Sequence, residues 1–235
     1  MIPDILRVTV AGFALGAVVM AIGSRSVTPD AARARWHKLA VFFVIVHAVL
    51  AAAAFGRPWV LAVLGIVLLA GTAELTRAWR LIPRPRPIFV WPLFLAIGAL
   101  AAWNTVRLPP AAFAFLFLAA AAGDGFSQVV GQWIGRRRLA PRVSPAKTVE
   151  GLLGGLCAAG AVAAMASGLI DLTPPRAALV GVLVGITGLA GDLAASWVKR
   201  RAGIKDYSGA LPGQGGFLDR FDSLLGALAL AGCCL

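Results

Sequence analysis

The stretch 58–76 reads P-W-V-L-A-V-L-G-I-V-L-L-A-G-T-A-E-L-T, with Glu74 as its one charged side chain. An apolar helix of about 20 residues, rising 1.5 Å per residue, crosses the hydrocarbon core of a bilayer. Comparable runs recur at 5–23, 39–55, 88–103, 110–134, 149–170, 177–197 and 217–235. We therefore predict an all-α, polytopic integral membrane bundle of about eight transmembrane helices. The runs 110–134 and 217–235 contain charges and are the least regular of the eight.

The composition supports one continuous membrane domain. The 235 residues have a mean hydropathy of +0.85 and are 14% charged, whereas soluble domains are about 25% charged. We divide the chain into N-terminal membrane helices, 1–110, and catalytic membrane helices with their loops, 111–235. The second part carries most of the acids: Asp124, Glu150, Asp171, Asp192, Asp206, Asp219 and Asp222. All except Asp171 lie in three short polar clusters, and chemistry is expected there.

Basic residues alternate between the connections of these runs. Of the 22 Lys and Arg, 17 lie in the segments 25–38, 77–86, 136–147 and 199–205, and the intervening loops carry one each, at Arg57, Arg107 and Arg176. The positive-inside rule then places those four segments in the cytoplasm and both termini outside. Since topology explains the net charge of +12, we predict no nucleic-acid partner. A basic cytoplasmic face favours anionic membrane lipids.

The first polar cluster spans 123–150. Asp124 interrupts an apolar run, and because a charge in hydrocarbon is costly, it is expected to face the bundle interior or water. Further on, 144–151 reads S-P-A-K-T-V-E-G, which predicts a helix start capped by Ser144 or Thr148, with Glu150 in the first turn. The N–H groups of such a helix start, together with Lys147, attract phosphate. The structural alternative is a basic membrane loop with an ordinary cap.

The second cluster centres on Asp192 in the run 177–197. Asp192 lies seven residues before Lys199, two helical turns away on the same face. Two interpretations of this carboxylate are possible. It could simply pair with an Arg of a neighbouring helix, or it could belong to a site that handles a charged substrate.

The third cluster, 205–222, combines a Gly-rich segment with acids. The Gly-rich segment from Pro212 to Gly216 lets the backbone approach a ligand closely. Asp219 and Asp222 are three residues apart, so both carboxylates project from one side of a helix, with Arg220 beside them. Carboxylates suit a hard divalent cation such as Mg²⁺, and neighbouring bases suit a polyphosphate.

The stretch 196–222, S-W-V-K-R-R-A-G-I-K-D-Y-S-G-A-L-P-G-Q-G-G-F-L-D-R-F-D, resembles the signature of the phosphatidate cytidylyltransferase (CDP-diacylglycerol synthase) family. That pattern is Ser-x-x-Lys-Arg, four residues, Lys-Asp, a Gly/Pro-rich His-Gly-Gly loop and Asp-Arg-x-Asp. The segment 144–151 and Gly191-Asp192-Leu193 resemble the family as well, and Asp124 falls where it has an Asp. The signature residues in register are Ser196, Lys199, Arg200, Lys205, Asp206, Pro212, Gly215, Gly216, Asp219, Arg220 and Asp222.

The resemblance implies metal-assisted attack of a lipid phosphate on the α-phosphorus of CTP, giving CDP-diacylglycerol from phosphatidate and releasing pyrophosphate. It implies Mg²⁺, with a second cation left open. Asp192 and Asp219 are the first choices as metal ligands, followed by Asp222 and Asp124. The residues implied to bind CTP or lipid are Ser144, Lys147, Ser196, Lys199, Arg200, Lys205, Asp206, Gln214, Gly215, Gly216 and Arg220. The implied location is a bacterial inner membrane, with the site facing the cytoplasm and open sideways to lipid.

One position departs from the signature: Gln214 stands where the family has His. The nucleophile is a phosphomonoester oxygen whose second pKa is near 6, so it needs little help from a base. Gln can still donate and accept hydrogen bonds. The departure therefore bears on rate and substrate choice more than on reaction class.

Three other functions remain open. They are a cytidylyltransferase for another, isoprenoid-type lipid phosphate, a phosphatidyltransferase that consumes CDP-lipid, and a non-catalytic membrane protein that binds or transports lipid. The acid spacing of the phosphatidyltransferases, four residues, does not fit Asp219 and Asp222. Gly154-Gly155 and Gly181-x-x-x-Gly185 suit close helix packing, either between two copies in a homodimer or, as we favour, inside one bundle.

Overall fold

The computed structural model describes residues 2–24 and 28–235. Within them the chain forms an all-α bundle with one small hairpin, which confirms the predicted fold class. Arg25, the first residue of the basic segment 25–38, lies outside the described residues. The helices are α1 (Ile2–Ser24), α2 (Pro29–Phe55), α3 (Arg57–Leu81), α4 (Val90–Arg107), α5 (Pro110–Ile134), α6 (Val149–Met165), α7 (Pro174–Arg201) and α8 (Leu218–Cys234), with a 3₁₀ turn, η1, at Ser167–Leu169.

Each of the eight predicted apolar runs overlaps one of these helices, and the run 149–170 continues beyond α6 through η1. Among the described residues, five helices are long and apolar enough to cross a membrane: α2, α3, α4, α5 and α7. Helices α6 and α8 have 17 residues each and are shorter. Large apolar side chains such as Phe55, Leu69 and Ile88 lie on the outer surface of the bundle, where a bilayer would cover them. The chain is a polytopic integral membrane protein.

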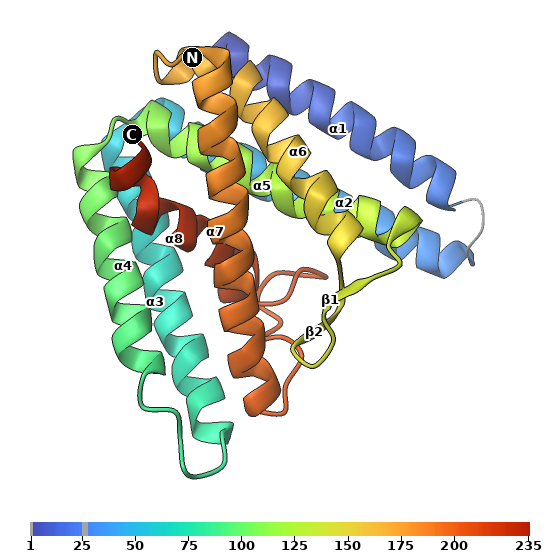
Figure 1. Cartoon of the computed structure of the whole chain (residues 1–235), viewed down its shortest axis with the longest axis vertical. Helices are drawn as coiled ribbons and strands as arrows, with labels where there is room; N and C mark the ends of the chain where they lie inside the picture. Colours follow the sequence, from blue (N-terminus) through green and yellow to red (C-terminus); the bar gives the residue numbers. More distant parts are fainter. Residues whose placement is uncertain (1, 25–27) are drawn as a thin grey trace.

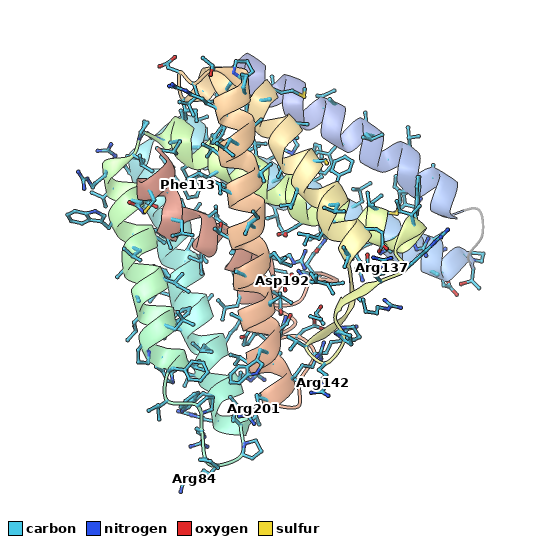
Figure 2. All side chains as sticks on the ribbon, in the orientation of Figure 1. Arg84, Phe113, Arg137, Arg142, Asp192 and Arg201 are labelled. Carbon is cyan, nitrogen blue, oxygen red and sulfur yellow. The ribbon has the colours of Figure 1, made fainter. Side chains whose placement is uncertain are left out.

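The helices fall into two sets of different inclination (Figure 1). Helices α3, α4 and α7 run upright in this view, whereas α1, α2, α5 and α6 cross them obliquely. Both termini lie toward the top of the view, and the α3–α4 and α7–α8 connections lie at the bottom. Arg84, Arg142 and Arg201 project at this lower end in Figure 2. Three of the four basic connections therefore place an arginine at this end, away from the termini.

Helix α5 runs through the interior of the bundle. Every residue from Ala112 to Ala120 is buried, because this stretch is apolar on all sides and other helices cover it. Small residues bring the helices around it close together. A Cβ on Gly181 of α7 would lie 2.5 Å from the Ala159 carbonyl oxygen of α6, and one on Gly155 would lie 2.6 Å from the Gly123 oxygen of α5. The glycine pairs thus pack inside one bundle, which was the favoured alternative.

An antiparallel hairpin, β1 (Arg138–Ala140) and β2 (Ser144–Thr148), precedes α6. The sequence analysis placed a helix start here and did not predict strands. Thr148 is the cap, since its side chain accepts a hydrogen bond from the Gly151 N–H at 3.1 Å. Ser144 lies on the strand instead, so its assignment as a cap was wrong. Pro145 follows it, and a residue before proline is restricted to extended backbone.

The close crossing of α6 and α7 generates a stability prediction. Gly181→Ala forces a methyl group onto the α6 backbone, and we expect a loss of about 1–3 kcal/mol. The matched control is Gly65→Ala in α3, where a Cβ would meet nothing within 4 Å and the better helix propensity of Ala should be neutral or slightly stabilising. Thermal unfolding in detergent micelles measures both. Equal midpoints for the two variants would contradict the proposed crossing.

Candidate functional site

Three of the predicted carboxylates lie near one another, one on each of the helices α5, α7 and α8. Asp124, Asp192 and Asp222 interact electrostatically with one another although they come from three helices. The approach of α7 to α8 depends on Gly191, where a Cβ would lie 2.8 Å from the Asp222 carbonyl oxygen. Gly188, one turn earlier, faces Ser223 in the same way. The glycine before Asp192 is therefore needed to bring the acids together.

Lys147 supplies positive charge to this acid cluster. It reaches from β2 and forms an ion pair with Asp192, and both side chains are about one quarter exposed. The Ser196 hydroxyl, one turn along α7, donates to Asp192 Oδ1 at 3.2 Å. Asp192 is thus paired with a lysine of the hairpin rather than with an arginine of a neighbouring helix. Its partner remains accessible enough to exchange this contact for a phosphate.

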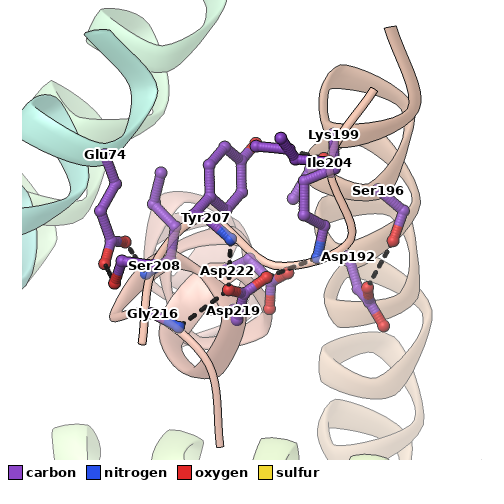
Figure 3. Close-up of polar contacts among 12 residues, drawn as sticks. Glu74, Asp192, Ser196, Lys199, Ile204, Tyr207, Ser208, Gly216, Asp219 and Asp222 are labelled. Atoms are coloured by element: carbon purple, nitrogen blue, oxygen red, sulfur yellow. Dashed lines mark hydrogen bonds and ion pairs between the residues drawn. The ribbon is translucent and has the colours of Figure 1, made fainter. Parts of the chain in front are cut away.

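Asp219 instead binds the loop between α7 and α8 (Figure 3). Its Oδ1 accepts a hydrogen bond from Lys199 Nζ at 2.5 Å, and its Oδ2 accepts from the backbone N–H groups of Tyr207 and Gly216, each at 2.8 Å. The Lys199 and Asp219 side chains are 9% and 4% exposed. Both oxygens of Asp219 are therefore occupied by protein donors, and the pair is shielded from water.

Tyr207 lies at the centre of this loop and was not among the predicted site residues. Burial, reinforced by the nearby Asp222, Asp219 and Glu74 carboxylates, raises the Tyr207 pKa well above its usual range. The hydroxyl therefore stays protonated and donates to the Ala195 carbonyl oxygen at 3.1 Å. The available sequence signal was that this is the one tyrosine of the chain, inside a polar loop.

The sequence analysis also missed Glu74 of α3 as a functional residue. It is buried and accepts hydrogen bonds from Ser208 Oγ at 2.5 Å and from the backbone N–H groups of Phe217 at 3.0 Å and Leu218 at 2.8 Å. The signal in the sequence was an isolated acid in an otherwise apolar run. Its partners could not be deduced, because they lie more than 130 residues away.

The glycines of the loop serve these carboxylates. Gly213 and Gly215 have φ of +72° and +88°, a region that side chains rarely adopt. A Cβ on Gly215 would lie 2.8 Å from Asp219 Oδ2. The predicted close approach is therefore present, but in the structure the approaching group is a carboxylate of the protein. Gln214 Nε2 donates to the Lys38 carbonyl oxygen of α2 at 2.7 Å, which ties the loop to a third helix.

The remaining predicted residues lie around this centre. Arg200 donates to the carbonyl oxygens of Val143 at 3.1 Å and Ile204 at 3.2 Å, so it links the hairpin to the loop. Three others have exposed side chains: Lys205, Asp206 and Arg220. Lys205 and Arg220 carry the positive charge that an anionic ligand requires, whereas the Asp206 carboxylate would repel such a ligand.

Residues 89–234 match the model of the cytidylyltransferase family, which is more than half of the chain. The chain belongs to the cytidylyltransferase family. The resemblance noted in the sequence is thereby confirmed, and the match includes every predicted site residue. Helices α1 to α3, and with them Glu74, lie outside it.

Relatives agree with this assignment. The chain is 40% identical over 145 residues to the uncharacterized protein YnbB of Escherichia coli K12, covering 57% of this chain and 48% of that protein. It is 39% identical over 141 residues to a phosphatidate cytidylyltransferase of Mycobacterium bovis, covering 58% and 44%. A Brucella abortus phosphatidate cytidylyltransferase is 42% identical over 122 residues, covering 49% and 43%. The matches span less than half the length of these relatives.

The donor set of the acid cluster fits a hard divalent cation. Lys199 is neutralised by Asp219, while Lys147 pairs with Asp192 and, together with Arg220, acts on Asp124. Two bases then balance three carboxylates, so the cluster is still short of positive charge. Asp222 Oδ2 is buried and has no hydrogen-bond partner among the described residues. In that same part of the chain, no three His, Cys, Asp or Glu form a cluster able to hold an ion alone. Mg²⁺ commonly takes one or two carboxylates and completes its shell with substrate phosphates.

The buried Lys199–Asp219 pair generates a second prediction. Lys199→Met keeps the length of the side chain but leaves Asp219 charged and unpaired, and breaking a buried pair in this way costs about 3–5 kcal/mol. The control is Asp30→Asn, which removes an exposed contact with Arg33 and should leave stability unchanged. Unfolding of the purified variants in micelles measures both. A Lys199→Met protein as stable as the control would contradict the structural role of the pair.

Proposed function

We propose that this protein is a CTP-dependent cytidylyltransferase that converts a lipid phosphate, phosphatidate in the first instance, to its CDP-lipid. The observation that carries the proposal is the under-neutralised acid cluster beside Lys147, at the basic end of a membrane bundle. A triphosphate with its cation matches this arrangement of charges. The names of the relatives in Mycobacterium and Brucella support the same substrate.

The reaction joins a phosphate oxygen of the lipid to the α-phosphorus of CTP. The bond from that phosphorus to the bridging oxygen of the β-phosphate breaks, and pyrophosphate leaves with its electron pair. A phosphomonoester is largely dianionic at neutral pH, so the nucleophile needs no strong base. Catalysis would therefore come from positioning and from stabilisation of charge.

The residues divide into those that bind phosphate and those that bind the cation. Lys147, held near the site by Asp192, would bind phosphate oxygens and release its carboxylate partner. Asp192 and Asp222, with Asp124 beside them, would hold Mg²⁺. When bound, magnesium would neutralise charge on the triphosphate and the departing pyrophosphate. Asp219, the earlier choice alongside Asp192, is better suited to holding the loop, because both its oxygens have protein partners.

The depth of the site suits a substrate anchored in a bilayer. Asp192 lies nine residues before the end of α7 at Arg201, about 14 Å along a helix. Asp222 lies one turn inside the start of α8. A lipid phosphate at the interface could reach this level while its acyl chains stay in the membrane. We propose that the site faces the cytoplasm of a bacterial inner membrane, where CTP is available.

Pyrophosphate release from CTP by protein in mixed micelles, with Mg²⁺ and phosphatidate, tests the proposal. We expect phosphatidate-dependent turnover that falls by about 100-fold or more in Asp222→Asn, since a ligand of the cation that would neutralise the developing charge is lost. Asp171→Asn is the matched control: its carboxylate is exposed in the α6–α7 connection, and its positive φ of 51° suits Asn.

Each outcome discriminates between functions. Silence with phosphatidate but turnover with an isoprenoid monophosphate would replace the lipid and keep the reaction class. Silence with both lipids, in protein that unfolds cooperatively, would overturn the proposed function. Full activity of Asp222→Asn would show that the Asp222 carboxylate is not required for the reaction.

Gln214→His tests the departure from the family signature. An added general base contributes about 10²–10⁴-fold where proton transfer limits the rate. Since the lipid phosphate is already ionised, we expect a change in kcat of less than about tenfold, with little change in the pH profile. Measurement of kcat between pH 6 and 9 for both proteins decides this. A rise of 100-fold or more would show that the chain lacks a base that the reaction needs.

A further inference from the structure

Glu74 lies outside the family match, yet it contacts the loop on which the candidate site depends. It comes from α3, it is 6% exposed, and all its hydrogen-bond partners lie between Ser208 and Leu218. A buried carboxylate in an apolar helix is costly unless it is fully hydrogen-bonded. Its presence there therefore calls for a role that an apolar residue could not fill.

The contacts define that role as a helix cap supplied from another helix. The first N–H groups of an α-helix have no partner within the helix. Helix α8 begins after Phe217, whose apolar side chain cannot accept a hydrogen bond, and Glu74 accepts from the N–H groups of Phe217 and Leu218. A negative charge at this end is also favoured by the helix dipole. Glu74 thus holds the start of the helix that carries Asp219 and Asp222.

Two glycines make room for this contact. A Cβ on Gly216 would lie 2.8 Å from Glu74 Oε2, and one on Gly71 of α3 would lie 3.0 Å from Leu218 Cδ2. On the loop side, Ser208 Oγ donates to Oε1 (Figure 3). Both oxygens of Glu74 are thereby engaged by the protein, which separates Glu74 from the acids near Lys147.

We propose that Glu74 is a positioning residue for nucleotidyl transfer. It fixes the first turn of α8 and the loop before it, and this keeps Asp222 of α8 next to Asp192 of α7. The proposal deepens the proposed function and rests on it. Glu74 acts through the backbone of α8 and touches no substrate. Its loss should therefore lower kcat more than it weakens binding of either substrate.

The number of hydrogen bonds lost predicts a graded loss of activity from native protein through Glu74→Gln to Glu74→Ala. The Gln amide has one acceptor oxygen, so in either orientation Glu74→Gln leaves one of the two backbone N–H groups facing an NH₂. Glu74→Ala removes all three bonds. We expect kcat to fall by about tenfold in Glu74→Gln and by about 100-fold in Glu74→Ala, on the scale expected when reacting groups are misplaced by about 1 Å. The KM values for CTP and lipid should change less than about threefold.

Hydrogen–deuterium exchange gives a readout independent of turnover. In micelles without substrate, the amides of 207–218 should exchange faster in Glu74→Ala than in the native protein, with Glu74→Gln between them. Ser208→Ala removes one partner alone, and combined with Glu74→Ala it should add little, because both changes break the same contact. Asp171→Asn is the control for loss of a carboxylate and should match the native protein in both assays.

The outcomes separate this inference from the proposed function. Faster exchange together with a loss confined to kcat supports the positioning role. Unchanged exchange in Glu74→Ala, or faster exchange with native kcat, overturns it. A rise in KM for CTP with kcat preserved also overturns it, because it would make Glu74 a binding residue. If native protein turns over no lipid phosphate, the proposed function fails, and exchange still decides whether Glu74 holds the start of α8.

Discussion

The ion pair between Lys199 and Asp219 is the interaction on which the site depends. Both groups are almost fully buried, and a charge in such a place is tolerated only when a partner and further hydrogen bonds compensate it. Asp219 meets that condition by accepting from the backbone at Tyr207 and Gly216 as well. One carboxylate therefore joins the end of α7, the middle of the loop and the start of α8. The position of Asp222, one turn further along, follows from this junction.

Close approach of helices is the second constraint. Within a bilayer, apolar burial gives helices little reason to associate, so packing and polar contacts must hold them together. Gly188 and Gly191 let α7 touch α8 at the level of the acids. Further along α8, Asn104 of α4 donates to the Leu228 carbonyl oxygen at 2.8 Å. Helix α8 is thus fixed along its length, which an arrangement of three mutually repelling carboxylates requires.

The sequence predicts what is local and periodic, and fails where distant segments decide. Apolar runs and alternating bases predict the membrane bundle, because each run carries its own length and charge. The spacing of Asp219 and Asp222 places them on one side of a helix, but their different partners depend on how the loop folds back, which spacing does not encode. Glu74 and its amide partners are separated by more than 140 residues. The apolar run around Glu74 contains no sequence signal from which its contact with the start of α8 could be predicted.

The segment that matches the family model is contacted by helices outside the match. The match begins at residue 89, yet the loop inside it is held by Glu74 of α3 and by the Lys38 carbonyl oxygen of α2, through Gln214. Lys38 contributes only its carbonyl oxygen, so this position of α2 can change in sequence while the contact persists. The contact from α3, in contrast, needs the carboxylate of Glu74. The matched segment thus carries the chemical groups, and the unmatched helices help to determine where those groups stand.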